Sequence, residues 1–151
     1  MEFRIPSSIK HEHEELHQEL KKMTGTGRKT GEMAKKVERV MYTHFLKEEE
    51  YALPPLGLLP DLAKGMLSPD MASVFSLTDR LKADLPNMIA EHQQIVAALN
   101  DLIQAAEQEG KEEAVQFAQK LQLHAREEEE VSYPAAIVIG EYLHLALSRA
   151  H

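Results

Sequence analysis

The stretch "HFLKEEEYALP", His44 to Pro54, places three consecutive glutamates shortly after a histidine. A second stretch, "HAREEEEVSYP", His124 to Pro134, repeats this pattern further along the chain. The histidine, the glutamates at the fourth to sixth positions after it and the proline at the tenth all recur at an offset of 80 residues. The repeat predicts two similar halves, which share either a charged surface or a site that is built twice.

Shorter segments upstream of each stretch also resemble one another. "EHEEL", Glu12 to Leu16, corresponds to "EHQQI", Glu91 to Ile95, and the histidines of the two segments differ by 79 residues. A single inserted residue therefore separates two otherwise parallel halves. The sequence predicts a pair of helical hairpins, over about residues 8–54 and 69–134, within a single domain spanning residues 1–151.

Helix-forming residues dominate the chain, and no segment alternates as a strand does over any useful length. Proline and glycine divide it into predicted helices at about residues 7–24, 30–53, 69–109 and 111–132, followed by a short helix from Pro134. Pro86 is expected to kink or split the third helix. The predicted fold class is all-α: an antiparallel up-and-down four-helix bundle with a short extra C-terminal helix.

Composition excludes several classes of function. The 151 residues carry a net charge of -8, and no basic stripe follows a predicted helix, which disfavours nucleic-acid binding. There is no cysteine, so disulfides, thiolate nucleophiles and cysteine-held metals are excluded, and any metal must be bound by nitrogen and oxygen. The N-terminus lacks a signal-peptide core and no apolar run is long enough to cross a membrane, so a cytoplasmic protein is predicted.

Four histidines lie on the apolar faces of the four main predicted helices: His13, His44, His92 and His124. A residue four positions later is rotated by only about 40° on a helix, whereas the fifth is about 140° away. Glu48 and Glu128 are therefore predicted to point inward, and Glu49 and Glu129 to face water. The third position is excluded as a shared ligand because it is Lys47 in the first half.

A single histidine on an apolar face is more often a hydrogen-bonded core residue than a metal ligand, and a run of glutamates is usually a solvated surface. Four imidazoles and two carboxylates that converge in one bundle are a different case. Buried carboxylates without partners cost several kcal/mol each, and no inward Lys or Arg is predicted to neutralise them. A pair of metal ions would satisfy all six groups, and this nitrogen and oxygen set suits iron, manganese or zinc.

The six residues, in this order, resemble the motif of the hemerythrin-like, HHE cation-binding family. The family pattern is a His, a His-x3-Glu, a His and a second His-x3-Glu on four successive helices, and the resemblance covers the chain from about Ser8 to Pro134. It implies a four-helix bundle around two non-haem iron ions, joined by the two glutamates and by an oxo or hydroxo bridge. Zinc or manganese remains an alternative. Family members bind dioxygen, sense oxygen or iron, or handle peroxide and nitric oxide.

Oxygen-carrying members have a second histidine four residues after the third-helix histidine, where this chain has Val96. That difference argues against reversible oxygen carriage. His17, four residues after His13, is either a fifth imidazole ligand or a histidine at the rim of the site. Tyr51 is expected near one end of the site, either donating a hydrogen bond to a bridging oxygen or filling the end of the bundle. His11, His144 and His151 match nothing in the pattern.

Three functions are compatible with this pattern. The first is a di-iron protein that binds or reacts with a small oxidant (dioxygen, peroxide or nitric oxide), and peroxide decomposition or nitric oxide handling would be its enzymatic form. The second is an iron-sensing or oxygen-sensing or metal-binding module without catalysis. The third is a structural zinc site or a metal-free bundle. The expected partner is a small-molecule oxidant, while a partner protein or a homo-oligomer stays open, since the last helix has an apolar face.

Overall fold

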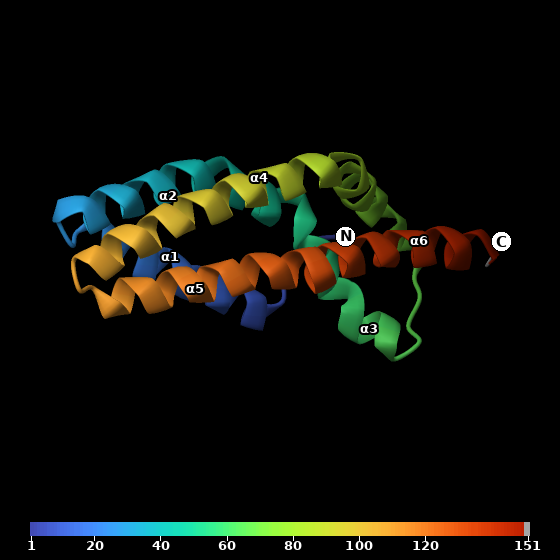
Figure 1. Ribbon diagram of the computed structural model, residues 1–151. Coiled ribbons are helices and arrows are strands. Elements are labelled where there is room, and N and C mark those ends of the chain that lie inside the picture. Colours follow the sequence, from blue (N-terminus) through green and yellow to red (C-terminus); the bar gives the residue numbers. More distant parts are fainter. Residues whose placement is uncertain (150–151) are drawn as a thin grey trace.

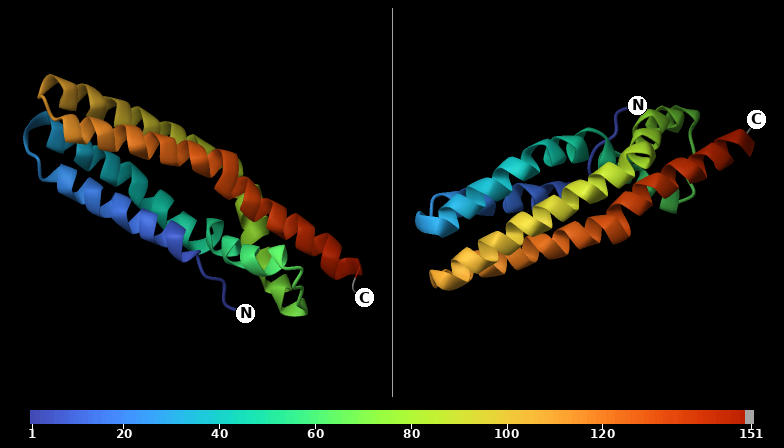
Figure 2. Two further views of the ribbon diagram at one scale, coloured as in Figure 1. Left: turned by 90° about the horizontal axis from the view of Figure 1, so that it is seen from below. Right: turned by 45° about the horizontal axis from the view of Figure 1, so that its top comes forward.

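A computed structural model describes residues 1–149, which are almost entirely helical and contain no strand. Four long helices form the body of the molecule: α1 (Ser7–Thr24), α2 (Arg28–Lys47), α4 (Phe75–Gln108) and α5 (Glu112–Glu127). They pack in the order α1, α2, α4, α5 around the bundle, with α5 returning to α1, and neighbours run in opposite directions (Figures 1 and 2). The predicted all-α bundle is confirmed.

The connection between the two hairpins contains the 3₁₀ helix η2 (Pro54–Leu58) and the short helix α3 (Leu59–Ala63). A second 3₁₀ helix, η3 (Pro69–Val74), stands where the third helix was predicted to begin. Ser68 caps η3 by accepting a hydrogen bond from the backbone N–H of Asp70, a role that is common for a serine directly before a helix. These elements cover one end of the bundle beside the last helix (Figure 1).

The last helix, α6 (Tyr133–Arg149), has 17 residues and is longer than the short helix that was predicted. It continues the line of α5 beyond the bundle (Figure 1). Pro86 does not split α4, which remains one helix of 34 residues with the proline inside it. The first turns of α4 run at an angle to the rest in Figure 2, as expected where a proline removes one backbone donor.

The hydrophobic core consists of two separate clusters of buried side chains. The first lies towards the α1–α2 and α4–α5 turns and includes Leu20, Phe45 and Leu99. The second lies towards α6 and includes Tyr51, Met88 and Tyr133. The predicted metal ligands lie where the residues of the first cluster give way to those of the second, so they form a polar layer between two apolar ones. Each buried side chain of this size stabilises the fold by about 1.5–3 kcal/mol, which holds the polar layer in place.

Two π-helical turns interrupt the α-helical winding at equivalent positions. They are η1 (Glu48–Ala52), which follows α2, and η4 (Glu128–Ser132), which joins α5 to α6. In the first, the N–H of Leu53 donates to the carbonyl of Glu48 at 2.9 Å, a bond that spans five residues instead of four. Single π turns inside α-helices occur frequently at functional sites. Both turns here begin at the predicted glutamate ligand.

A bilayer-crossing segment would need a long, uniformly apolar helix, and no helix within residues 1–149 meets that description.

Candidate metal centre

The structure brings the six predicted ligands together in the middle of the bundle, and all six are buried: His13, His44, Glu48, His92, His124 and Glu128. They form two overlapping groups. One contains His13 and His124, the other contains His44 and His92, and both glutamates belong to each group. Within a group, one possible ligand atom from every residue lies within 4.8 Å of the others. Metal binding by these residues remains a prediction that the geometry makes specific.

Each glutamate offers one oxygen to each histidine pair. Glu48 Oε1 lies 2.7 Å from His44 Nε2, while its Oε2 lies 3.4 Å from His13 Nε2. Glu128 Oε1 lies 3.3 Å from His92 Nε2, and its Oε2 lies 3.3 Å from His13 Nε2 and 3.4 Å from His124 Nε2. The two carboxylates therefore span the distance between the pairs, as carboxylates that bridge two ions must.

Two buried oxygen atoms test whether metal ions fit this site. Glu48 and Glu128 are 1% and 3% exposed, and the Oε2 atom of each has no hydrogen-bond partner. A buried carboxylate oxygen without a partner is costly, since it has lost water and gained nothing. A cation bound by His13 and His124 would satisfy both Oε2 atoms, and a second cation bound by His44 and His92 would engage the two Oε1 atoms. The donor set of imidazole and carboxylate therefore fits two transition-metal ions.

Burial and mutual charge divide the protons of the metal-free cluster unequally. The pKa of Glu48 is raised well above its ordinary value by burial and by the nearby charge of Glu128. Burial would also raise the pKa of Glu128, but interactions with Glu48 and with the nearby imidazoles of His124, His13 and His92 outweigh it and lower that pKa. A proton bound by this pair of carboxyl groups is therefore held by Glu48 in preference to Glu128.

The histidines are divided in the same way. Burial and the charge of His92 lower the pKa of His44 to about 4, which keeps its imidazole neutral. Burial also acts to lower the pKa of His124, but interactions with Glu128 and Glu12 outweigh it and raise that pKa to about 9. His124 therefore carries the proton that a metal ion would have to displace.

Three further carboxylates contact the outer nitrogens of the inner histidines. His124 Nδ1 donates to Glu12 at 2.7 Å and His92 Nδ1 donates to Glu129 at 3.0 Å. His44 Nδ1 lies 3.5 Å from Glu91, which also pairs with Lys47 at 2.7 Å. The hydrogen bonds of His124 and His92 fix the orientation of these two rings, with Nε2 directed at the site, whereas His44 Nδ1 makes no hydrogen bond.

Glu129 corrects one expectation and Glu49 confirms the matching one. Glu49 is exposed, as predicted for the fifth position after His44. Glu129 was predicted to face water, but its side chain is only 35% exposed because it accepts the hydrogen bond from His92. Helical phase alone missed this contact, since a long glutamate side chain can reach back toward a neighbouring helix.

Tyr133 is a site residue that the sequence reasoning missed. Its hydroxyl lies 3.1 Å from His44 Nε2 and 3.2 Å from His92 Nε2, and its side chain is fully buried. Burial and the charges of Glu48 and Glu128 raise its pKa, so the phenol keeps its proton in the metal-free chain. The equivalent residue in the first half is Leu53, which has no polar group. The phenol therefore distinguishes the His44–His92 pair from the His13–His124 pair.

The π turn explains why Tyr133 was missed. It is the fifth residue after Glu128, a position that an α-helix turns away from the site. Because η4 takes one extra residue into the turn, the fifth residue returns to the face of Glu128. The tyrosine in "EEVSYP" was the one sign of this residue in the sequence. Recognising it required knowing that the helix contains a π turn with one extra residue.

Tyr51 and His17, the two further candidates, lie away from the paired groups. The hydroxyl of Tyr51 donates to Asp84, and the buried ring packs at the end of the bundle beneath the guanidinium of Arg80, 4.2 Å above its centre. His17 is exposed, belongs to neither ligand group among the described residues, and packs on the ring of Phe45 with the ring centres 3.7 Å apart. In this structure, His17 lies at the rim.

The remaining histidines are also accounted for. His11 is exposed and pairs with Glu15 at 3.1 Å, as expected for a solvent-facing residue. His144 is exposed on α6 and stacks on Phe75 with the ring centres 3.6 Å apart. His151 lies outside the described residues.

Comparison with known proteins agrees with this geometry. The sequence profile of the family described as "Hemerythrin HHE cation binding domain" matches residues 5–136, most of the chain. The chain therefore belongs to the hemerythrin HHE cation-binding family. Searches of curated proteins and of solved structures found no match.

Proposed function

We propose that this protein holds two non-haem iron ions between its four inner histidines and that it binds or reacts with a small oxidant. The observation that carries the proposal is the arrangement of Glu48 and Glu128, which are buried, span both histidine pairs and have unpartnered Oε2 atoms. A single structural ion would need only one of the two pairs. Membership of a cation-binding family supports the same conclusion.

The protein residues around the site have separable tasks. Glu48 and Glu128 would hold the ions together, and the outer carboxylates of Glu12 and Glu129 orient two of the histidines. The two apolar clusters restrict water, which strengthens every electrostatic interaction inside the site. Iron, when bound, supplies the change of oxidation state that the side chains cannot. Peroxide is the oxidant that we favour, because its breakdown needs little beyond the metals and a proton donor.

Tyr133 is the residue placed to supply that proton. Its Oη is the one hydroxyl within hydrogen-bond distance of inner histidines among the described residues. A buried phenol that retains its proton can donate a hydrogen bond to a small molecule beside the His44–His92 pair and can pass the proton on.

Metal content gives the direct test of the proposed function. Protein produced in iron-supplemented cells is expected to contain about two iron ions per chain by elemental mass spectrometry, since the six ligands form two paired groups. The same sample should show visible absorption from ligand-to-iron charge transfer and should consume hydrogen peroxide. One zinc ion per chain, or no metal in a stably folded protein, would rule out the redox function.

Replacing Tyr133 with phenylalanine tests the proton donor. Tyr133→Phe is expected to leave iron content unchanged while slowing peroxide consumption by at least about tenfold, because positioned proton donors contribute factors of this size or larger. Tyr51→Phe is the matched control, since it removes another buried phenol whose hydroxyl contacts Asp84 and not the cluster. Equal effects of the two substitutions would show that Tyr133 acts only through packing.

A further inference from the structure

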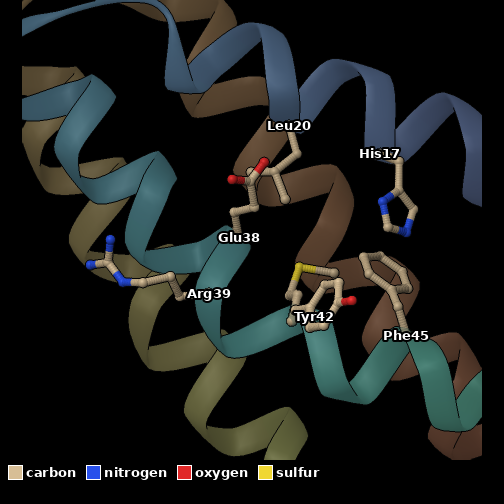
Figure 3. A pocket seen from close by; sticks show the side chains of 7 residues that line it. His17, Leu20, Glu38, Arg39, Tyr42 and Phe45 are labelled. Carbon is tan, nitrogen blue, oxygen red and sulfur yellow. The ribbon is translucent and has the colours of Figure 1, made fainter.

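Two surface pockets lie at equivalent places in the two halves of the bundle. The first, of about 460 Å³, lies between α1 and α2 and is lined by residues that include His17, Tyr42 and Phe45 (Figure 3). The second, of about 410 Å³, lies between α4 and α5 and is lined by residues that include Val96, Gln122 and Ala125. Offsets of 79 and 80 residues relate His17 to Val96, Tyr42 to Gln122 and Phe45 to Ala125.

The pocket between α1 and α2 is closed on its inner side by aromatic rings. The ring of His17, from α1, lies against the ring of Phe45, from α2, at one side of the pocket (Figure 3), with the ring centres 3.7 Å apart. Behind them, Phe45 meets His13 edge to face, with ring centres 5.5 Å apart. None of the six inner ligands lines this pocket. The rings of His17 and Phe45, together called the plug, therefore separate this pocket from the cluster of inner ligands.

The pocket between α4 and α5 lacks such a plug. Val96 and Ala125 stand where the first half has His17 and Phe45, so two rings are replaced by small aliphatic groups. As a result, His92 itself forms part of the wall, together with Glu129, which holds the outer nitrogen of the same imidazole. His92 belongs to the ligand group that also contacts Tyr133. This pocket therefore reaches a member of the cluster.

We propose that small molecules reach the metal centre through the pocket between α4 and α5, and that His17 and Phe45 close the equivalent position between α1 and α2. The inference rests on the proposed function, because it assumes ions between the histidine pairs. It makes the His44–His92 pair, which Tyr133 contacts, the pair that small molecules can reach. It also gives the exposed His17 a role, as part of the plug on the closed side.

Azide, a three-atom anion that coordinates metals, is a suitable probe for this route. Stopped-flow absorption on the metal-loaded protein gives its association rate. Ala125→Phe copies the Phe45 plug into the second half and is expected to lower this rate by at least about tenfold, since close-packed side chains leave no gap for a small molecule. Val96→Met fills the same pocket more gently and should lower the rate in the same direction.

The first half provides the complementary variant. Phe45→Ala in the Ala125→Phe background removes one plug while keeping the other, and it is expected to restore much of the lost rate. Leu123→Phe is the control, because it adds a ring to an exposed position of α5 that lines neither pocket. It should leave the azide rate unchanged.

The outcomes separate this inference from the proposed function. Iron content and the resting spectrum report on the proposed function, whereas the ratio of azide rates between variants reports on the route and can also be measured with cobalt(II). Wild-type rates in both Ala125→Phe and Val96→Met, with metal content intact, would overturn the route. The route would also be overturned if azide left the absorption spectrum of the metal-loaded wild-type protein unchanged, because a pocket without a plug should admit so small an anion.

Discussion

Glu48→Gln is expected to abolish binding of the metal pair while leaving the metal-free fold intact. Glutamine cannot supply two anionic oxygens, so the affinity for cobalt(II), measured by competition with an indicator chelator, should fall by more than about 100-fold. This exceeds the 10- to 100-fold loss typical when only a residue outside the direct ligands is removed. Glu128→Gln should have a comparable effect, because Glu128 spans the same two histidine pairs.

The stability of the metal-free chain makes the test specific. Burial and Glu128 raise the pKa of Glu48, so glutamine copies the neutral form already favoured there. The free energy of unfolding in urea, with metal removed, is expected to change by less than about 1 kcal/mol, the scale of one hydrogen bond. Glu49→Gln, at an exposed neighbouring position, should alter neither measurement. Retention of two tightly bound ions by Glu48→Gln would contradict the bridging role.

The second large effect is a steep dependence of metal affinity on pH. His124 in the metal-free chain has a pKa of about 9, so below that pH a metal ion must displace its proton. Each displaced proton makes the apparent affinity rise about tenfold per pH unit, and the rise should level off as the pH passes the pKa of His124. The slope should be steeper at low pH, where Glu48, with its raised pKa, also holds a proton. Cobalt(II) titrations across this range would measure it.

Glu12→Gln isolates the cause of this dependence. Glu12 accepts the hydrogen bond from His124 Nδ1 and helps to raise its pKa, so without that carboxylate the pKa falls and the affinity levels off at a lower pH. Glu14→Gln, at an exposed position of the same helix, should reproduce the wild-type curve. A flat affinity curve between pH 6 and about 9 in the wild type would show that His124 is already neutral.

The fold and the six inner residues could be predicted because they depend on short-range periodicity. A residue and its neighbour four positions later share a helical face whatever the rest of the chain does, so His44 and Glu48 had to point the same way. The two halves repeat the same pattern, so a ligand position had to suit both halves, and this narrowed the choice of inward-facing glutamate. The lysine at position 47 settled which glutamate faces inward.

The residues that were missed depend on departures from that periodicity or on contacts between helices. Tyr133 lies beyond an extra residue in the helix, so counting from Glu128 with an α-helical period gives the wrong face for it. Glu129 reaches His92 on a different helix, and no spacing within one helix reports such a contact. The start of α6 was predicted at Pro134, one residue from the observed start, since a proline near a helix start costs no hydrogen bond, but the helix is longer than the short one that was expected.

The relation between the two hairpins has one more consequence. Two identical chains that paired to form this bundle would be bound by symmetry to have identical ends, with the same side chain at every equivalent place. Joining both hairpins in one polypeptide removes that constraint. The second half has Tyr133 where the first has Leu53, and Ala125 where the first has Phe45, although the six predicted ligands are the same residue types in both halves. Covalent linkage thus gives the chain what a homodimer could not have: a shared centre with two different faces.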